Sequence, residues 1–298
     1  MKARTPGIFP SLDFDKPIKS YRNPVRRFLE WQMSLCERFD RALPERYRID
    51  GNTDFMESIL PRRLPTGITV YDVGGGKTPA VSPAQKRSLG LRVVGLDVDA
   101  GELARAPSEA YDDVVVADIS RHVGAGDADL VICQGVLEHI RDTAGGFRGL
   151  GSLLRPGGIL LIFVPNRNAP FSLLNRILPE GIKRRLLFWI FPGKKTGSGF
   201  PAFYDRCTPR GFRTLADEAG LTLVEQRLYY RSRYFSFFLP LYVLWRGYLL
   251  IAERLLKDGA AETFSMVLMR PQQAAAANSR ESSPLPPTLQ NHTEVEHG

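Results

Sequence analysis

Acidic residues and glycines follow short apolar runs of this 298-residue sequence at spacings that could build a ligand site. Asp72 ends the first run and stands just before Gly74, Gly75 and Gly76 in the stretch TVYDVGGGKTP. A glycine-rich turn after a strand lets a ligand approach the backbone closely. Asp97 ends the second run, twenty-one residues beyond Gly76. An acidic residue at that separation can accept hydrogen bonds from both hydroxyls of a ribose.

The third and fourth apolar runs end in residues that suit the remaining parts of a nucleoside-like ligand. Asp118 and Ile119 follow the third run. A carboxylate there can accept a hydrogen bond from the exocyclic amine of an adenine, and an apolar side chain can pack on its ring. Gln134 closes the fourth run. Ligands of open α/β sheets bind at the carboxyl ends of strands, so four signals at consecutive strand ends predict one pocket.

The glycine stretch alone is also compatible with a plain turn, and two other nucleotide-binding loops compete with it. The G-x-G-x-x-G loop of nicotinamide-binding folds needs a third glycine for close packing of helix and strand, and Pro79 stands at that place. A phosphate-binding loop needs the spacing G-x-x-x-x-G-K-[ST], which GGGKTPA lacks. Both are therefore disfavoured.

The elements that position these residues alternate between β-rich runs and helical or loop stretches. Near-continuous apolar strands separated by crossovers predict a parallel sheet covered on both faces, and hence a doubly wound α/β domain. A helix is expected over 208–220, with a threonine cap and a closing glycine. The expected strands are 67–73, 91–98, 112–118, 128–134, 158–165, 221–230 and 262–270.

The order and spacing of five stretches resemble the class I S-adenosylmethionine-dependent methyltransferases, particularly the broad group that includes the ubiquinone-biosynthesis C-methyltransferases. The resemblance covers about residues 67–271. It implies a Rossmann-like, mostly parallel sheet of seven strands whose last strand runs antiparallel, and S-adenosylmethionine as the cofactor. The stretches that carry it are YDVGGGKT, VVGLDVD, VVVADIS, DLVICQGVLEHI and LLRPGGILLIFVPN.

The resemblance also implies a role for each strand-end residue. Two departures accompany it: Thr78 stands at the third small position of the glycine motif, and prolines interrupt the helix that follows. Carried over residue by residue, the methionine side of the cofactor would lie against Asp72, Gly74, Gly75 and Gly76, the ribose against Asp97 with Val98 or Asp99, the adenine against Asp118 and Ile119, and the sulfonium against Gln134.

Methyl transfer from a sulfonium is an in-line displacement that releases a neutral thioether, so positioning and removal of water can supply much of the catalysis. A base is needed only where the acceptor arrives protonated, as a hydroxyl does. His139, just past the fourth run, is a candidate base because imidazole titrates near neutral pH; the alternative is a histidine that orders the loop. Tyr204 and Asp205 are candidate substrate contacts, and Tyr204 is equally compatible with packing.

Composition divides the chain into three parts. Residues 1–60 are expected to form an arm and a helical extension, with one helix running from Pro24 until Pro44 stops it. The catalytic domain is expected over 61–271. Residues 272–298 are rich in Ser, Pro, Gln and Ala, and this composition predicts a disordered tail.

Two apolar, basic insertions, 166–207 and 231–260, follow the fifth and sixth strands and should emerge on the cofactor face. Each contains a stretch, 183–195 and 234–257, that could bind an anionic membrane surface; the alternative is a lid packed on the sheet. A membrane span is disfavoured because Arg246 interrupts the second stretch. In either case, a bulky apolar cover suggests an amphiphilic substrate.

Net charge and cysteine content bear on the binding partners and the cellular compartment of the protein. The net charge of +8 favours anionic partners, but no reader motif for nucleic acid is evident, so nucleic acid ranks behind lipid. Cys36, Cys133 and Cys207 are too far apart for a zinc site and odd in number for a disulfide framework. The amino terminus lacks the apolar core of a signal peptide, so a cytoplasmic location is expected, with peripheral attachment to a membrane as an option.

These observations predict methyl transfer from S-adenosylmethionine to a small or lipid-linked acceptor. The acceptor atom is expected to be an oxygen of a glycan, glycolipid or isoprenoid-type metabolite, on the strength of the two insertions alone. The alternative is a non-catalytic, membrane-associated binding protein that retains the fold.

Overall fold

A computed structural model describes residues 24–169, 172–173, 176, 200–231 and 235–272, and the description below is confined to them. All seven predicted strands form one sheet in the order β3-β2-β1-β4-β5-β7-β6. The doubly wound α/β fold with an antiparallel last strand is confirmed, because only β7 opposes its neighbours. The strands are β1 Thr69–Val73, β2 Arg92–Asp97, β3 Asp113–Val116, β4 Ala128–Gln134, β5 Leu154–Pro165, β6 Thr222–Tyr229 and β7 Thr263–Met269.

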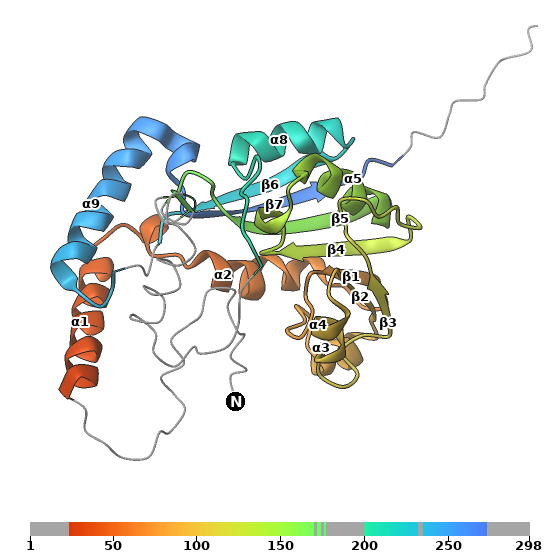
Figure 1. The fold of residues 1–298 in the computed structure, drawn as a ribbon, viewed down its shortest axis with the longest axis horizontal. Helices are drawn as coiled ribbons and strands as arrows, with labels where there is room; N and C mark the ends of the chain where they lie inside the picture. Colours follow the sequence, from red (N-terminus) through yellow and green to blue (C-terminus); the bar gives the residue numbers. More distant parts are fainter. Residues whose placement is uncertain (1–23, 170–171, 174–175, 177–199, 232–234, 273–298) are drawn as a thin grey trace, which may run out of the picture.

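Helices cover both faces of this sheet (Figure 1). On one face, α5 and α8 contribute Phe147 and Phe212, whose rings pack edge to face 5.0 Å apart. The helical elements are α1 Pro24–Arg41, η1 Glu45–Tyr47, α2 Gly51–Asp54, η2 Phe55–Ile59, η3 Pro61–Arg63, α3 Pro83–Leu89, α4 Ala100–Ala104, η4 Leu137–His139, α5 Thr143–Leu153, α8 Pro209–Glu218, α9 Leu239–Leu256 and η5 Lys257–Ala260.

The opposite face of the sheet is covered by the end of the amino-terminal extension. Phe55, Ile59 and Leu60 are each at most 2% exposed and pack with β1, β4 and β5 residues in one core cluster. The ring of Phe55 lies 5.6 Å from that of Phe163 on β5. The end of the expected extension, 1–60, therefore supplies one side of the core.

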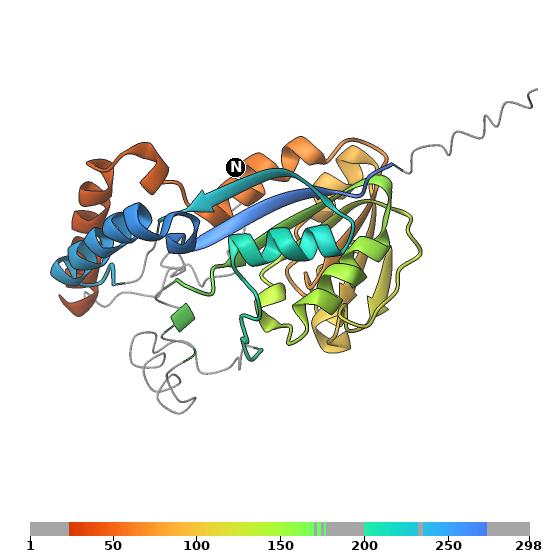
Figure 2. The same ribbon diagram turned by 90° about the horizontal axis from the view of Figure 1, so that it is seen from above.

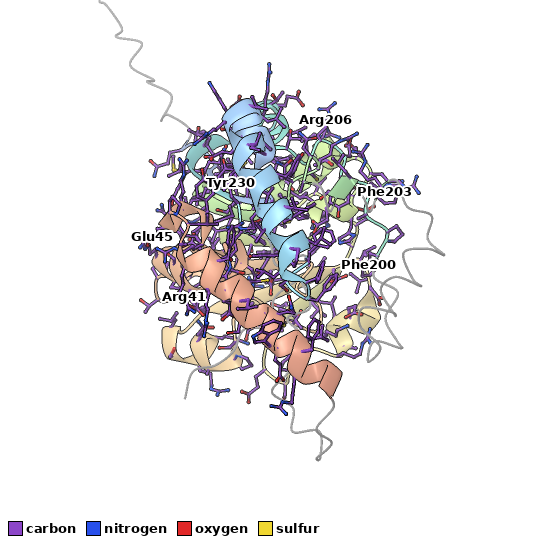
Figure 3. All side chains as sticks on the ribbon, turned by 90° about the vertical axis from the view of Figure 1, so that its left-hand side faces the viewer. Arg41, Glu45, Phe200, Phe203, Arg206 and Tyr230 are labelled. Carbon is purple, nitrogen blue, oxygen red and sulfur yellow. The ribbon has the colours of Figure 1, made fainter. Side chains whose placement is uncertain are left out.

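Strands β1, β2, β3, β4, β5 and β6 all point the same way, so their last residues meet at one border of the sheet, here called the carboxyl edge. Both predicted insertions leave the sheet at this edge, as expected. Beyond it stand α1 and α9, which pack side by side as a helix pair (Figures 1 and 2). Figure 3, which views the molecule from that side, shows the helix pair in front of the sheet.

Two elements differ from expectation. β5 begins at Leu154, four residues before the start of the strand expected over 158–165. The segment between β6 and β7, expected as an apolar and basic insertion, contains an 18-residue helix, α9. It leaves the sheet and packs on α1. No helix among the described ranges is both long enough and apolar enough to cross a membrane.

Candidate functional site

The turn after β1 is organised from beneath by Asp72, which is 2% exposed. Its Oδ2 accepts hydrogen bonds from the backbone N–H of Ala80 at 2.8 Å and from the Tyr111 hydroxyl at 3.3 Å. The same hydroxyl also lies 3.0 Å from the carbonyl oxygen of Gly76. Burial raises the pKa of Asp72 to about 6. Asp72 therefore shapes the loop and can act on a ligand through it.

The three glycines occupy positions where a side chain would collide with the site. Gly74 has φ +76°, and a Cβ there would overlap Val136. A Cβ on Gly75 would overlap the Asp72 carboxylate, and Gly76, at φ +45°, lies against Asp97. The turn thus needs glycine both for its backbone and for space. The helix after it is short, as expected: α3 starts at Pro83 behind a Ser82–Gln85 capping box.

At the end of β2, the two neighbouring aspartates have separate tasks. Asp97 is 9% exposed, and its Oδ1 accepts the N–H of Asp99 at 2.9 Å. Burial, with the charges of Asp99 and Glu102, raises the pKa of Asp97. Asp99 caps α4 by accepting the N–H groups of Gly101 and Glu102, so its carboxylate is already used. Of the ribose candidates, Asp97 is favoured, with the exposed Val98 beside it.

The two residues predicted to bind the adenine follow β3 and lie in different environments. Asp118 is exposed, and its Oδ1 accepts hydrogen bonds from the N–H and hydroxyl of Ser120 at 2.9 and 2.7 Å. Ile119 is 4% exposed and belongs to the core cluster on the α5 side. The Ile119 side chain faces inward, and its packing on an adenine ring stays a prediction.

Gln134, at the end of β4, has a partner that sequence reasoning missed. Its Nε2 donates to Oδ1 of Asn52 at 2.7 Å, so the amino-terminal extension reaches the carboxyl edge at the place predicted for the sulfonium. Asp54 secures this approach: it forms an ion pair with Arg227 at 2.9 Å and accepts the Tyr229 hydroxyl at 2.7 Å. A contact across 82 residues leaves no local sequence signal.

Glu138 and His139, in η4, face the segment that enters α8. The carbonyl oxygen of Glu138 accepts the N–H groups of Phe203 and Tyr204. Its carboxyl is 3% exposed, its Oε2 has no hydrogen-bond partner among the described residues, and burial raises its pKa to about 7. The Nδ1 of His139 lies 3.0 Å from the carbonyl oxygen of Pro201, and its Nε2 lies 3.9 Å from Oε1 of Glu138.

The two other predicted substrate contacts are used within the protein. Tyr204 is 3% exposed and packs in the core cluster on the α5 side. Asp205 accepts the N–H of Thr143 at 3.2 Å through its carboxylate and the Thr143 hydroxyl at 2.7 Å through its carbonyl. Both residues therefore fix the segment before α8 to α5, and their contact with a substrate stays a prediction.

The second insertion presents an apolar stripe on the outer face of α9. It consists of Leu241, Leu244, Tyr248, Ile251 and Leu255, which are 37–76% exposed. Their spacing of three and four residues places them on one face of the helix. Arg246, the residue that interrupts this stretch, is 1% exposed and points away from the stripe into the helix pair. The basic stretch 183–195 lies outside the described residues.

The cofactor that the glycine turn and strand-end carboxylates imply is S-adenosylmethionine, and the residues present fit it. The turn after β1 needs glycine, because any Cβ on Gly74 or Gly75 would overlap a neighbouring side chain. Asp97 and Asp118 offer carboxylates at two successive strand ends. Gln134 offers an amide whose nitrogen is already held by Asn52.

Comparison with known families agrees with this geometry. A family described as "Methyltransferase domain" matches residues 39–226, which include the end of the amino-terminal extension. Ubiquinone biosynthesis O-methyltransferases are among the curated relatives. That of Sodalis glossinidius (strain morsitans) is 32% identical over 164 residues, covering 49% of this chain and 65% of its own. That of Escherichia coli O9:H4 (strain HS) is 33% identical, covering 49% and 67%.

The chain spans about half to two thirds of the length of these curated relatives. These relatives are named as methyltransferases, in agreement with the resemblance to the class I S-adenosylmethionine-dependent methyltransferases. Among solved structures, phosphoethanolamine N-methyltransferase 2 of Haemonchus contortus, in complex with S-adenosyl-L-methionine, is 18% identical with a TM-score of 0.48 and covers 83% of this chain and 60% of its own.

Proposed function

We propose, from the premise that this chain belongs to the methyltransferase domain family, that it transfers a methyl group from S-adenosylmethionine to an oxygen of a small or lipid-linked acceptor. The acceptor class we favour is a glycan, glycolipid or isoprenoid-type metabolite. The observation that supports the activity most directly is the meeting of the glycine turn, Asp97, Asp118 and Gln134 at one edge of the sheet.

In this proposal the chain binds and orients the cofactor, which supplies an activated methyl group when bound. Asp97 accepts the ribose hydroxyls, and Asp118 accepts the adenine amine. The glycine turn gives the methionine part access to backbone N–H groups, and Asp72 fixes that turn from below. Gln134, oriented by Asn52, presents its amide oxygen to the positively charged sulfonium. Orientation of this kind supplies a large part of the rate enhancement of a two-reactant displacement.

His139 is the proposed general base for a hydroxyl acceptor. Pro201 has a carbonyl oxygen 3.0 Å from Nδ1, so the hydrogen of this imidazole is assigned to Nδ1 and the lone pair to Nε2. Nε2 is then the atom that takes a proton. The side chain is 32% exposed, which leaves it open to an incoming acceptor.

Calorimetric titration with S-adenosylmethionine tests the cofactor site. Asp97→Asn keeps an acceptor for the Asp99 N–H but loses the charge, so we expect the dissociation constant to rise at least about tenfold. Asp217→Asn, a matched change on the exposed face of α8, should bind as the wild type does. Equal affinity of both variants would refute the placement of the ribose. Absence of binding to the wild type would favour the non-catalytic alternative.

Measurement of kcat distinguishes the role of His139 as a base from a role in cofactor binding. His139→Ala should lower kcat about 10²- to 10⁴-fold and leave the dissociation constant of S-adenosylmethionine unchanged. Because the acceptor is unidentified, the assay follows transfer of labelled methyl groups to fractionated cell lipids and glycans. If the His139→Ala variant methylates every accepted fraction at the wild-type rate, His139 is not the general base.

The apolar stripe supports a lipid-linked acceptor and peripheral attachment to a membrane. Large aliphatic side chains and Tyr248 face solvent along α9, and Arg254 and Lys257 are exposed at its carboxyl end. Apolar residues flanked by basic ones are typical of helices that lie in the interface of an anionic bilayer. The helix pair stands at the carboxyl edge, so a bilayer in contact with it would face the cofactor site.

Vesicle flotation tests the attachment. The vesicles are phosphatidylcholine alone and phosphatidylcholine with phosphatidylglycerol. We expect Leu244→Gln/Leu255→Gln to lose flotation, because a fully buried leucine contributes about 1.5–3 kcal/mol. Val123→Gln, at an 82% exposed valine elsewhere on the surface, is the matched control and should float as the wild type does. If the wild-type protein floats with neither kind of vesicle, the proposed attachment to a membrane is wrong.

A further inference from the structure

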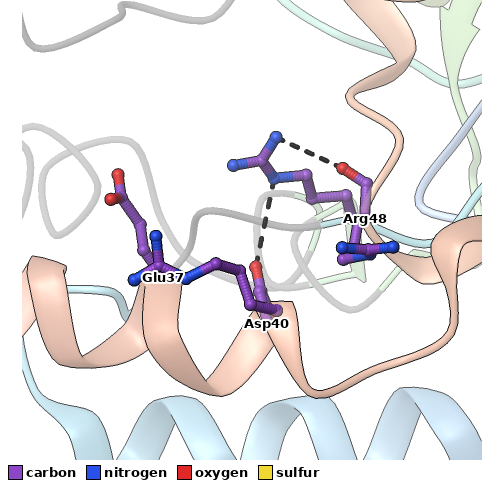
Figure 4. A pocket seen from close by; sticks show the side chains of 5 residues that line it. Glu37, Asp40 and Arg48 are labelled. Atoms are coloured by element: carbon purple, nitrogen blue, oxygen red, sulfur yellow. Dashed lines mark hydrogen bonds and ion pairs between the residues drawn. The ribbon is translucent and has the colours of Figure 1, made fainter.

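A pocket outside the cofactor site lies between the carboxyl end of α1 and the chain that leaves β6 (Figure 4). Its volume of about 240 Å³ is far above the 10–15 Å³ that one water molecule needs. The lining residues come from segments almost 200 residues apart in the sequence. They are Glu37, Asp40, Arg41, Arg48 and Arg231.

The acidic charge of Asp40 is already balanced from within the helix pair. Its Oδ1 lies 3.1 Å from Nε of Arg246, and its Oδ2 accepts the Tyr242 hydroxyl at 2.7 Å. Arg246 is 1% exposed, so this ion pair is shielded from water. With Asp40 and Arg246 cancelling, three arginines remain against the single carboxylate of Glu37, a net charge of +2 in the pocket.

Arg231 has a donor that the described residues leave open. Its Nη1 donates to the carbonyl oxygen of Arg48 at 3.3 Å. Its Nε is buried and has no hydrogen-bond acceptor among the described residues; the nearest carboxylate oxygen, Oδ2 of Asp40, lies 4.0 Å away. A buried guanidinium N–H without an acceptor is costly, and an anion in the pocket would satisfy it.

We propose that Arg41, Arg48 and Arg231 bind a phosphate group. Guanidinium groups match the oxygens of a phosphate in geometry and charge, and several arginines around one pocket favour a dianionic phosphate or a diphosphate over a single carboxylate. Arg41 and Arg48 are exposed, so the ligand enters from solvent or from a membrane surface, and the partly buried Arg231 closes the inner side.

The position of the pocket links it to the methyl-transfer site. Arg48 is four residues from Asn52, and four residues span at most about 14 Å. Asn52 touches Gln134, so a phosphate in the pocket would lie within reach of the reacting end of the cofactor site. This link rests on the proposed function, whereas the anion site does not. If the pocket and the cofactor site work together, the phosphate or diphosphate belongs to the acceptor or to a lipid that surrounds the acceptor.

The test is titration with inorganic diphosphate, followed by calorimetry and by the thermal unfolding midpoint. Arg41→Gln/Arg48→Gln removes two charges and keeps the contact between the Arg231 side chain and residue 48, because Arg48 meets Arg231 through its backbone. We expect diphosphate binding to weaken about tenfold for each lost arginine. Arg210→Gln, at an exposed arginine of α8, removes charge elsewhere and should change nothing.

A second arm identifies the source of the phosphate. Vesicles of phosphatidylcholine with phosphatidic acid are floated with and without diphosphate. Competition by diphosphate would identify a lipid headgroup as the natural ligand, and retained flotation would identify a soluble phosphorylated acceptor. The proposal is overturned if diphosphate fails to bind the wild type or binds the double variant equally well. S-adenosylmethionine affinity, measured on the same samples, shows whether the cofactor site has failed independently.

Discussion

Two carboxyl groups beside the cofactor edge lie almost entirely out of water. Asp72 keeps two hydrogen bonds there, whereas Oε2 of Glu138 has none among the described residues. Burial disfavours the ionised form, so the pKa of Asp72 is raised to about 6 and that of Glu138 to about 7. Both groups therefore make the stability of the fold depend on pH near neutrality.

For Glu138 the sign is fixed by the raised folded-state pKa. Below about pH 4 the carboxyl is protonated in both states; between about pH 4 and 7 only the unfolded chain loses the proton, so stability falls as pH rises. The shift from 4.5 to about 7 corresponds to about 3 kcal/mol. We expect Glu138→Gln to gain stability relative to the wild type between pH 5 and pH 8, measured by urea unfolding.

Glu57→Gln, at an exposed glutamate, is the control for this change and should follow the wild-type pH profile. Asp72 keeps its own pH dependence of stability, between about pH 4 and 6, in both proteins. A Glu138→Gln variant whose stability falls with pH as steeply as that of the wild type would show that Glu138 is ionised in the folded protein.

At the residue scale, local spacing predicted which residues stand at strand ends but not which way they face. The glycine turn, Asp97 and Gln134 could be placed because strand ends and tight turns leave local signals. Ile119 and Tyr204 could not, because their burial depends on α5 and α8 closing over them. Asn52 could not either, because its partner lies 82 residues away.

At the scale of the elements, α2 approaches the sheet closely. It begins at Gly51, where Asp50 caps the helix by accepting the N–H of Thr53 at 3.0 Å. A Cβ on Gly51 would lie 2.6 Å from the Thr263 hydroxyl oxygen and 2.7 Å from the Tyr229 ring. The absence of a side chain thus allows α2 to sit on β6 and β7 and bring Asn52 to Gln134.

Two glycine-to-alanine changes test how closely α2 packs on β6 and β7. Gly51→Ala should destabilise the protein by about 1–3 kcal/mol, because the added methyl overpacks a closed contact. Gly247→Ala, inside α9 where an added Cβ would meet no atom of the described residues within 4 Å, should stabilise it by about 0.5–1 kcal/mol, because alanine favours a helix. Denaturant unfolding gives both values. A loss at Gly247 as large as that at Gly51 would contradict this account of α2.

At the element scale, the strands were predictable because each combines β-rich composition with flanking turn residues. The start of β5 at Leu154 was not, because Pro156 and two glycines follow it and are typical of a helix end. The partner of α9 could not be predicted either, because the sequence does not say that α1 covers its buried side.

For the whole molecule, one buried arginine is among the residues that join the helix pair to the sheet domain. Arg246 donates to the carbonyl oxygens of Tyr47 and Tyr230 and pairs with Asp40. These contacts connect α9 with α1, with η1 and with the end of β6. Arg246 therefore fixes the pocket and the apolar stripe relative to the cofactor edge.

A double-mutant cycle measures this connection. Arg246→Met leaves Asp40 as a buried charge without its ion pair, so we expect a loss of about 3–5 kcal/mol in the free energy of unfolding. Asp40→Asn/Arg246→Met should recover part of that loss, because no charge is then stranded. If the losses of the single variants add in the double variant, the two side chains are not coupled.

The helix pair also imposes an order of events during synthesis. Asp40 and Tyr242 are 202 residues apart, so at about 5–20 residues per second the ribosome needs about 10–40 s to make the partner of α1. Throughout that time the inner face of α1, which includes Cys36 and Phe39, has no α9 to cover it. α1 is thus made well before the helix that covers it, and its inner face lacks that cover in the nascent chain during the interval.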